Sequence, residues 1–252
     1  EFRRVLFRSV CWAMIAVTST GNTAIIAQQT SAAGSGTLAI TTNGAVSGTT
    51  GIAANNAGSG ASTIIANSTV TGTSAEGILV TGAGAVTVTA NDVITGATRG
   101  LSLTGGSGGS GNILVNGTGG FVGGTGDAAN ILNSGSGTIT VNISGASSST
   151  GGNGFIVRDT AAGTGISVTT GSVTALTAGK NGIDVQSQSL TGNVTEVANG
   201  NIQAGNAGMV AAILPAAATG NVDVTANGSI TARFGIDAEN FGDLRDGDRS
   251  FA

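Results

Sequence analysis

The segment GNVTEVANGNI at residues 192–202 returns as GNVDVTANGSI at residues 220–230, 28 positions later. Self-similarity at a fixed spacing of 20–50 residues is typical of solenoid proteins, in which the chain winds through successive coils of similar structure. A glycine followed by an alternating apolar stretch recurs through the chain and marks where each predicted coil starts. These starts lie at Gly36, Gly84, Gly111, Gly137, Gly165, Gly192 and Gly220, with a weaker start near Ser62.

A second marker keeps the same period. It is a glycine followed by a large apolar residue, and the segment AANIL at 128–132 fills the place of one missing member. Two markers on one period of roughly 26 residues indicate a structural repeat and not low complexity alone. The second marker occurs at Gly51-Ile52, Gly77-Ile78, Gly100-Leu101, Gly154-Phe155, Gly182-Ile183, Gly208-Met209 and Gly235-Ile236.

Within a coil, apolar and polar residues alternate, as in GTITVNI at 137–143. This alternation predicts a strand with one buried face. A turn follows, then a second short strand such as SITA at 229–232, and a third after the second marker, such as GIDV at 182–185. One coil cannot bury its own apolar face, so we predict an all-β parallel β-helix, or β-solenoid, over residues 10–242. It has about eight coils of roughly 26 residues with three short strands each, and a length of roughly 40 Å at about 4.8 Å per coil.

Asparagine recurs in the turn after the first strand, seven residues after the coil's first glycine. Side-chain amides at matching turns of stacked coils would form ladders; alternatively these are ordinary turn residues. The positions are Asn43, Asn91, Asn199 and Asn227.

Composition narrows the class of protein. The chain has 45 Gly and 1 Pro in 252 residues, no His or Tyr, 9% charged residues and 40% apolar residues. The net charge of −4 gives no reason to expect nucleic acid or an anionic membrane as partner. The single cysteine, Cys11, excludes an internal disulfide framework and a cysteine-cluster metal site. No apolar run approaches the roughly 18 residues of a membrane span, and VCWAMIAV at 10–17 is interpreted as an early coil strand.

The two ends of the chain depart from the repeat. EFRRVLFRS at residues 1–9 has three arginines and neither Gly nor Thr, and it resembles the one-frame translation of a common short-read sequencing adapter. We therefore hypothesise that residues 1–9 are a non-native artefact and that the true protein begins upstream; the alternative is a short basic tail. Residues 243–252 are expected to be an irregular charged tail or a truncated next coil, and the whole chain a fragment of a longer one.

The patterns Gly-Thr-Ile-Thr-Val (137–141) and Gly-Ile-Asp-Ala-Glu-Asn-Phe (235–241), in a Gly-, Ala-, Thr- and Asn-rich and Cys-poor chain, resemble the passenger repeats of bacterial autotransporter and adhesin-type surface proteins. The resemblance covers about residues 18–242. It implies a right-handed parallel β-helix at the bacterial surface, extracellular and anchored in the outer membrane by a C-terminal membrane barrel of the full-length protein. That family shares no catalytic residue set, so no site residue is transferred.

Candidate catalytic groups are sparse. The absence of His excludes a Ser-His-acid triad, and Lys180, the one lysine, reads best as a turn residue in AGKNG. A polysaccharide-cleaving β-helix needs grouped carboxylates. Two groupings are conceivable: Glu196 with Asp223, 27 residues apart, and Arg158 with Asp159. The acids are otherwise scattered along the chain, at Asp92, Asp127, Asp159, Asp184, Glu196, Asp223 and Asp237.

Glu196 is the one acid whose position conflicts with the pattern. It lies four residues after Gly192, where other coils have Ile40, Val88 or Val224. Because a core-facing carboxylate is costly unless it is paired, we expect a β-bulge that turns Val197 inward and Glu196 outward.

Two glycine-rich stretches, 105–113 and 123–127, approach the Ca²⁺-binding pattern G-G-x-G-x-D without matching it, and are interpreted as flexible turns. Thr residues form pairs expected to face outward. Such rows would either match an ice lattice or simply be exposed strand residues. The pairs are Thr87 with Thr89, Thr138 with Thr140, and Thr169 with Thr170.

The sequence therefore predicts a structural and adhesive segment of a surface-displayed or secreted protein, with no catalytic, cofactor-binding or metal site. Its partners would be host-surface, carbohydrate or cell–cell contacts, made by Gly/Ser-rich turns such as 104–111 and 145–154. Two alternatives stay open: a carbohydrate-active β-helix (lyase or hydrolase) and an ice-binding solenoid. Acids clustered on adjacent coils would favour the enzyme.

Overall fold

The chain folds into a stack of parallel β-coils. The computed structural model describes residues 17–107, 109, 111–160 and 163–242, and these residues form 26 strands and no helix. None of them belongs to a helix that could span a membrane. The predicted artefact at residues 1–9, most of the apolar stretch at 10–17, and the predicted tail at 243–252 lie outside the described residues.

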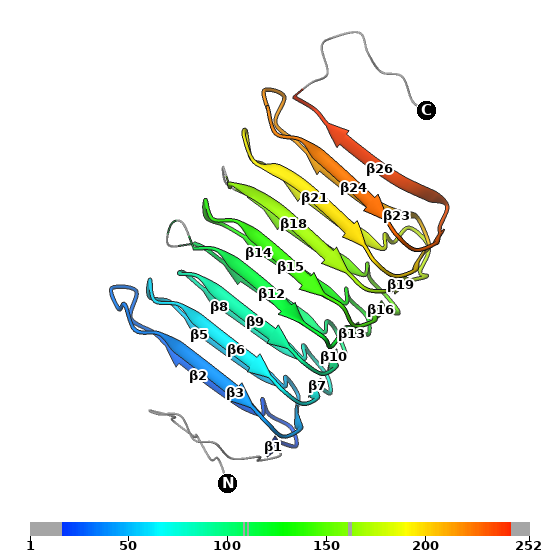
Figure 1. Cartoon of the computed structure of the whole chain (residues 1–252). Helices are drawn as coiled ribbons and strands as arrows, with labels where there is room; N and C mark the ends of the chain where they lie inside the picture. The colour runs from blue at the N-terminus through cyan, green and yellow to red at the C-terminus, as the bar shows by residue number, and fades with distance from the viewer. Residues whose placement is uncertain (1–16, 108, 110, 161–162, 243–252) are drawn as a thin grey trace.

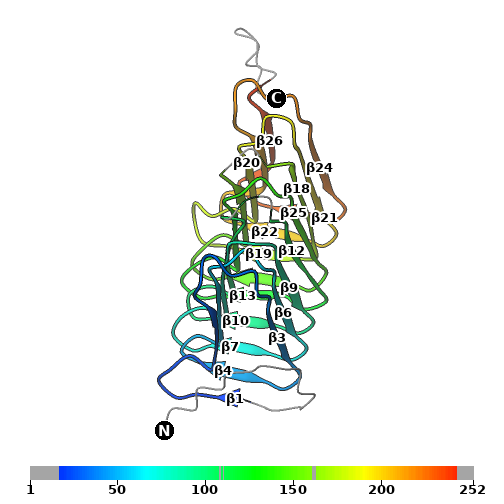
Figure 2. The same ribbon diagram turned by 90° about the vertical axis from the view of Figure 1, so that its left-hand side faces the viewer.

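Each coil contributes one strand to each of three sheets, here called A, B and C (Figures 1 and 2). Sheet A contains β1 (Val17–Thr18), β4 (Val46–Gly48), β7 (Val70–Gly72), β10 (Ile94–Gly96), β13 (Phe121–Gly123), β16 (Ser147–Ser149), β19 (Val173–Ala175), β22 (Ile202–Ala204) and β25 (Ile230–Thr231). Sheet B contains β2 (Ile25–Gln29), β5 (Ile52–Asn56), β8 (Ile78–Gly82), β11 (Leu101–Gly105), β14 (Ala129–Asn133), β17 (Phe155–Asp159), β20 (Ile183–Ser187), β23 (Ala207–Ile213) and β26 (Phe234–Asn240). Sheet C contains β3 (Leu38–Thr42), β6 (Ser62–Ala66), β9 (Val86–Ala90), β12 (Ile113–Gly117), β15 (Ile139–Ile143), β18 (Gly165–Thr170), β21 (Asn193–Ala198) and β24 (Val222–Ala226).

Every strand pairs in parallel with the equivalent strand of the next coil. Register partners are separated by 23 residues at the shortest, from Ile78 to Leu101, and by 29 from Val17 to Val46. The predicted β-solenoid of about eight coils with three short strands per coil is therefore confirmed. Figure 1 shows the coils following one another in chain order, with β1 and β26 at opposite ends of the stack.

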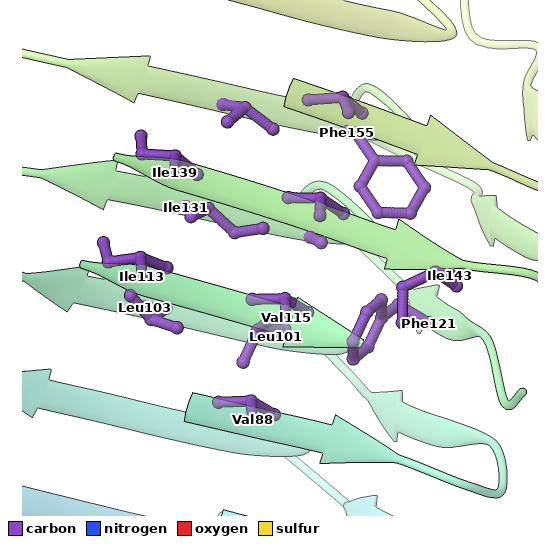
Figure 3. Packing of buried hydrophobic residues seen from close by; sticks show 14 of the residues in the cluster. Val88, Leu101, Leu103, Ile113, Val115, Phe121, Ile131, Ile139, Ile143 and Phe155 are labelled. Atoms are coloured by element: carbon purple, nitrogen blue, oxygen red, sulfur yellow. The ribbon is translucent and has the colours of Figure 1, made fainter. Parts of the chain in front are cut away.

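The core is a continuous column of stacked apolar side chains. At the first buried position of sheet B, Ile52, Ile78 and Leu101 lie in one register row. The middle position of sheet C repeats this with Ile64, Val88, Val115, Val141 and Val168. In Figure 3 the side chains of sheets B and C project into the same interior, layer upon layer.

Large and small side chains alternate between two neighbouring coils. Phe121 in sheet A is followed along its coil by Ala129 in sheet B, whereas the next coil has Ser147 in sheet A and Phe155 in sheet B. The two phenyl rings meet edge to face, with centroids 6.2 Å apart (Figure 3). Each ring thus occupies space that the small residue of the other coil leaves open, which keeps the core close-packed.

The second sequence marker has a steric explanation. A Cβ atom on Gly77 would lie 2.7 Å from Cγ2 of Ile94 and 2.8 Å from the carbonyl oxygen of Gly100. Gly182 is equally crowded by Ile202 of the next sheet A strand. The marker glycine therefore gives the apolar residue of sheet A room to enter the core, which explains why the two features repeat together.

Candidate functional site

A polar ladder runs along the corner where sheet A turns into sheet B. The Arg99 guanidinium lies between two acids, 3.8 Å from Oε1 of Glu76 and 3.5 Å from Oδ2 of Asp127. The backbone N–H and side-chain amide of Asn153 donate to Oδ1 of Asp127 over 2.9 and 3.0 Å. The backbone N–H of Asn181 donates to Oδ1 of Asn153 over 2.8 Å. These residues pair with one another across successive coils, so we interpret the ladder as a structural element that links neighbouring coils.

Sequence reasoning did not anticipate this corner ladder. Its members lie immediately before the marker pair that opens each sheet B strand, except Asn206, which lies two residues before its pair. An Asp, Asn, Glu or Arg recurring there at the coil period was the signal that could have revealed it. The positions are Glu76, Arg99, Asp127, Asn153, Asn181 and Asn206.

The structure separates the two side chains of the Arg158–Asp159 grouping, because neighbouring residues of a strand point to opposite faces of the sheet. Arg158 faces outward from β17, and its Nη2 lies 3.4 Å from Oδ2 of Asp184 on the next coil. Asp184 also accepts hydrogen bonds from the side chains of Asn181 and Gln186, over 3.3 and 3.0 Å. Both carboxylate oxygens of Asp184 therefore already interact with protein side chains.

Asp159 faces inward and occupies a position that asparagine fills in other coils. Asn133 ends its sheet B strand in the same register; its amide donates to the carbonyls of Gly137 (2.9 Å) and Gly111 (3.4 Å), and its oxygen accepts from Gly135 N–H (2.9 Å). Asn56 and Asn240 bond in the same way: the side-chain amide donates to a backbone carbonyl, and the side-chain oxygen accepts from the backbone N–H two residues later.

Asp159 makes different contacts at this position. The Ser187 hydroxyl donates to its Oδ2 over 2.8 Å, and the Gln188 N–H donates to its Oδ1. Burial raises the pKa of the Asp159 carboxyl above its usual value, while these two hydrogen bonds act in the opposite direction.

The predicted bulge at Glu196 is wrong. Strand β21 keeps the register of its neighbours, so Glu196 pairs with Val168 on one side and Val224 on the other, and its side chain is 0% exposed. Val197 lies on the outer face instead. Neither carboxylate oxygen of Glu196 has a hydrogen-bond partner in the structure. Burial, and secondarily the charge of Asp184, raises the pKa of Glu196 well above its usual value.

Glu196 and Asp223 do not form a carboxylate pair either. They lie on adjacent strands, but Asp223 is in register with Thr195 and is exposed on the outer face of β24. Lys180 lies in the turn before β20, where its carbonyl accepts from Asn206 N–H. In the part of the chain that the structure describes, no three or more His, Cys, Asp or Glu side chains are grouped so as to hold a metal ion.

The Asn ladders are confirmed in two segments. The Asn67 amide donates to Oδ1 of Asn43 over 2.8 Å, and the Asn91 amide donates to Oδ1 of Asn67 over 2.7 Å. Asn227 donates to Asn199 over 2.9 Å. Asn67 was missed because its coil begins weakly, at Ser62. The middle coils interrupt the ladder with other residues at this position, namely Thr118, Ser144 and Gly171.

The outer face of sheet C has a shallow hollow lined by hydroxyl groups. Thr140, Ser167 and Thr195 lie in one register row across β15, β18 and β21. The rest of the lining includes Thr138, Thr164, Thr191 and Asn193. This lining has no charged side chain, so the hollow offers neutral donors and acceptors.

The Thr rows are less regular than the sequence suggested. Thr170 is buried and faces the core, so Thr169 and Thr170 are not an outward pair. Leu114 interrupts the row of Thr87 and Thr140, and Asn116 is the register partner of Thr89. The outer face of sheet C therefore lacks the uniform Thr lattice on which the ice-binding alternative depended.

The two stretches expected to be binding turns each include part of a strand. Residues 106, 107, 109 and 111 lie in the connection from β11 to β12, whereas the stretch 145–154 contains strand β16 of sheet A. Ser147 and Ser149 of that strand are buried. Ser147 Oγ accepts from Phe121 N–H over 3.1 Å, so the connections in this stretch are limited to residues 145–146 and 150–154.

Comparison of the chain with protein-family models, with curated proteins and with solved structures finds no match.

Proposed function

We propose that the chain is a structural and adhesive segment of a bacterial surface-displayed or secreted protein, acting as a stiff spacer that presents variable turns. The observation that carries this proposal is the set of three strand ladders, which run from the first described coil to the last around a largely apolar core. Because each coil is hydrogen-bonded to its neighbours along three sides, bending the stack would break strand pairing. Such a stack therefore holds its two ends at a fixed separation.

The turns supply the variable part. The connections from sheet C to sheet A have two or three residues in every coil, for example 171–172 and 91–93, whereas those from sheet B to sheet C range from three residues (83–85) to eight (214–221). The connections from sheet A to sheet B also vary, from two residues (205–206) to seven (176–182). Length variation at these two corners leaves the core unaffected, and loops on a rigid scaffold are where binding groups usually lie. This arrangement supports a spacer with variable corners.

The hollow on sheet C supports the adhesive part of the proposal. Its hydroxyl and amide groups suit a neutral, hydroxyl-rich ligand such as a carbohydrate chain, which exchanges hydrogen bonds without needing a counter-charge. No aromatic side chain lines it, so each contact would be weak and attachment would rely on several copies at once. The carbohydrate-cleaving alternative is less favoured, because most acids of the described coils are paired, buried or isolated, although Asp237 and Glu239 share one face of the terminal strand β26.

Surface display is tested by labelling cells of the organism that carries the gene. An antibody raised against the folded full chain should label intact cells, with an antibody against a cytoplasmic protein confirming that the cells are closed. Labelling only after lysis would overturn the localisation.

Adhesion is tested with the full chain on immobilised neutral polysaccharides. Ser167→Arg places a long charged side chain in the hollow and should reduce binding. The matched control Thr174→Arg, on the outer face of sheet A, should leave binding unchanged. Equal binding by both variants and the wild type would exclude the hollow. Failure of the wild type to bind would overturn the adhesive role without bearing on the spacer.

A further inference from the structure

Among the described residues, Glu196 is the carboxylic acid that lies deepest in the column of core side chains without any partner. It is in the middle of β21, between Val168 and Val224, at a position where the other coils have Ile or Val. Its side chain is fully buried, and both carboxylate oxygens lack a hydrogen-bond donor. A buried group of this kind is tolerated when it is neutral and strongly disfavoured when it carries a charge.

No cation is placed to compensate a charge on Glu196. The strands packed against β21 are β18, β24, β20 and β23, and β18 and β23 contain no titratable side chain. Strand β20 contributes Asp184, a like charge that already pairs with Arg158. Strand β24 contributes Asp223, which is exposed on the opposite face of the sheet from Glu196. An ionised Glu196 would therefore be surrounded by apolar side chains, and the negative charge of Asp184 would add repulsion.

We propose that Glu196 makes this part of the rod a proton-controlled opening point: the coils containing β21 and β24 pack closely while the carboxyl is neutral and separate locally when it ionises. Separation of β24 from β21 would let water reach the charge without unfolding the other coils. A solenoid allows this, because each coil contacts only its neighbours and its layers part locally.

The direction of the pH dependence follows from linkage. Burial raises the pKa of Glu196 in the folded chain above its value in the opened chain, so the closed state binds the proton more tightly. The closed state is therefore fully favoured at pH values below the ordinary pKa of a glutamic acid. Its advantage is lost as pH rises toward the folded-state pKa, and across that window opening releases one proton. Opening then becomes up to about tenfold more frequent per pH unit.

Hydrogen–deuterium exchange of the full chain tests this. Backbone amides of β21 and β24 should lose protection by up to about tenfold per unit between about pH 5 and about pH 8, after correction for intrinsic exchange. Amides of β6 and β9, in coils without a buried acid, serve as the internal reference and should not follow. Constant protection of β21 over this range would overturn the proposal.

Two substitutions of Glu196 test whether its carboxyl group, and not a neighbouring group, controls the opening. Glu196→Gln keeps the shape without the titration, and Glu196→Val restores the residue of neighbouring coils; both should remove the pH dependence at β21. Asp223→Asn removes the neighbouring exposed acid and should leave the dependence intact. Persistence of the dependence in either Glu196 variant, or its loss in Asp223→Asn, would show that another group controls opening.

Discussion

Removing the phenyl ring of Phe155 should destabilise the middle of the rod by about 4–5 kcal/mol. The side chain is 0% exposed, and replacing a buried Phe by Ala costs about 3–5 kcal/mol, because the cavity adds to the lost transfer free energy. The cavity here should collapse incompletely, since one register neighbour, Ala129, is too small to fill it and the other, Ile183, is held in strand β20. The edge contact with Phe121 contributes about 0.5–1.5 kcal/mol within this total.

Equilibrium unfolding in urea, followed by far-UV circular dichroism, measures the loss for Phe155→Ala against the wild type. Hydrogen exchange should show the loss of protection concentrated in β14, β17 and β20, because each coil of a solenoid is coupled mainly to its neighbours. Leu176→Ala is the matched control, since Leu176 is 62% exposed and its truncation should change stability by less than about 0.5 kcal/mol. A loss below about 1.5 kcal/mol for Phe155→Ala would show that the core is not packed as described.

Three further substitutions have expected outcomes. Gly77→Ala should destabilise the chain by about 1–3 kcal/mol, measured by urea unfolding, because the added Cβ meets Ile94 and a backbone carbonyl; a neutral result would refute the steric role of the marker. Asn67→Ala removes two exposed ladder bonds and should cost no more than about 1 kcal/mol in the same assay, so a larger loss would mean that the ladder is a main source of stability. Asp159→Asn should raise the melting temperature more at pH 8 than at pH 4, because the raised pKa means that the Asp159 contribution is present at low pH and lost as pH rises; an equal gain at both pH values would contradict this.

Much of the fold was predictable from the sequence because its determinants are local. Alternation sets which face of a strand is buried, and the marker glycines, such as Gly182, recur wherever an apolar residue of sheet A must enter the core. The period then follows from stacking, because equivalent residues of successive coils must lie in register. Three strands per coil and about eight coils were derived from these features alone.

The individual polar contacts were not predictable, because they depend on which residues of different coils come together. Arg158 lies next to Asp159 in the chain, yet its partner is Asp184, 26 residues away. The corner ladder around Asp127 and the exchange of large and small residues at Phe121 and Phe155 are likewise properties of neighbouring coils. A single coil read by itself contains no information about either.

Glu196 shows where local reasoning fails. By itself, a carboxylate in a strand favours a bulge that exposes it. In the stack, β21 is paired on both sides, and a shift of one residue would turn Val194 and Ala198 out of the core and break two ladders of hydrogen bonds. The sequence alone determined the repeat and its alternating faces. Only the tertiary structure decided that Glu196 would be buried, because strand register is set cooperatively by the coils on either side.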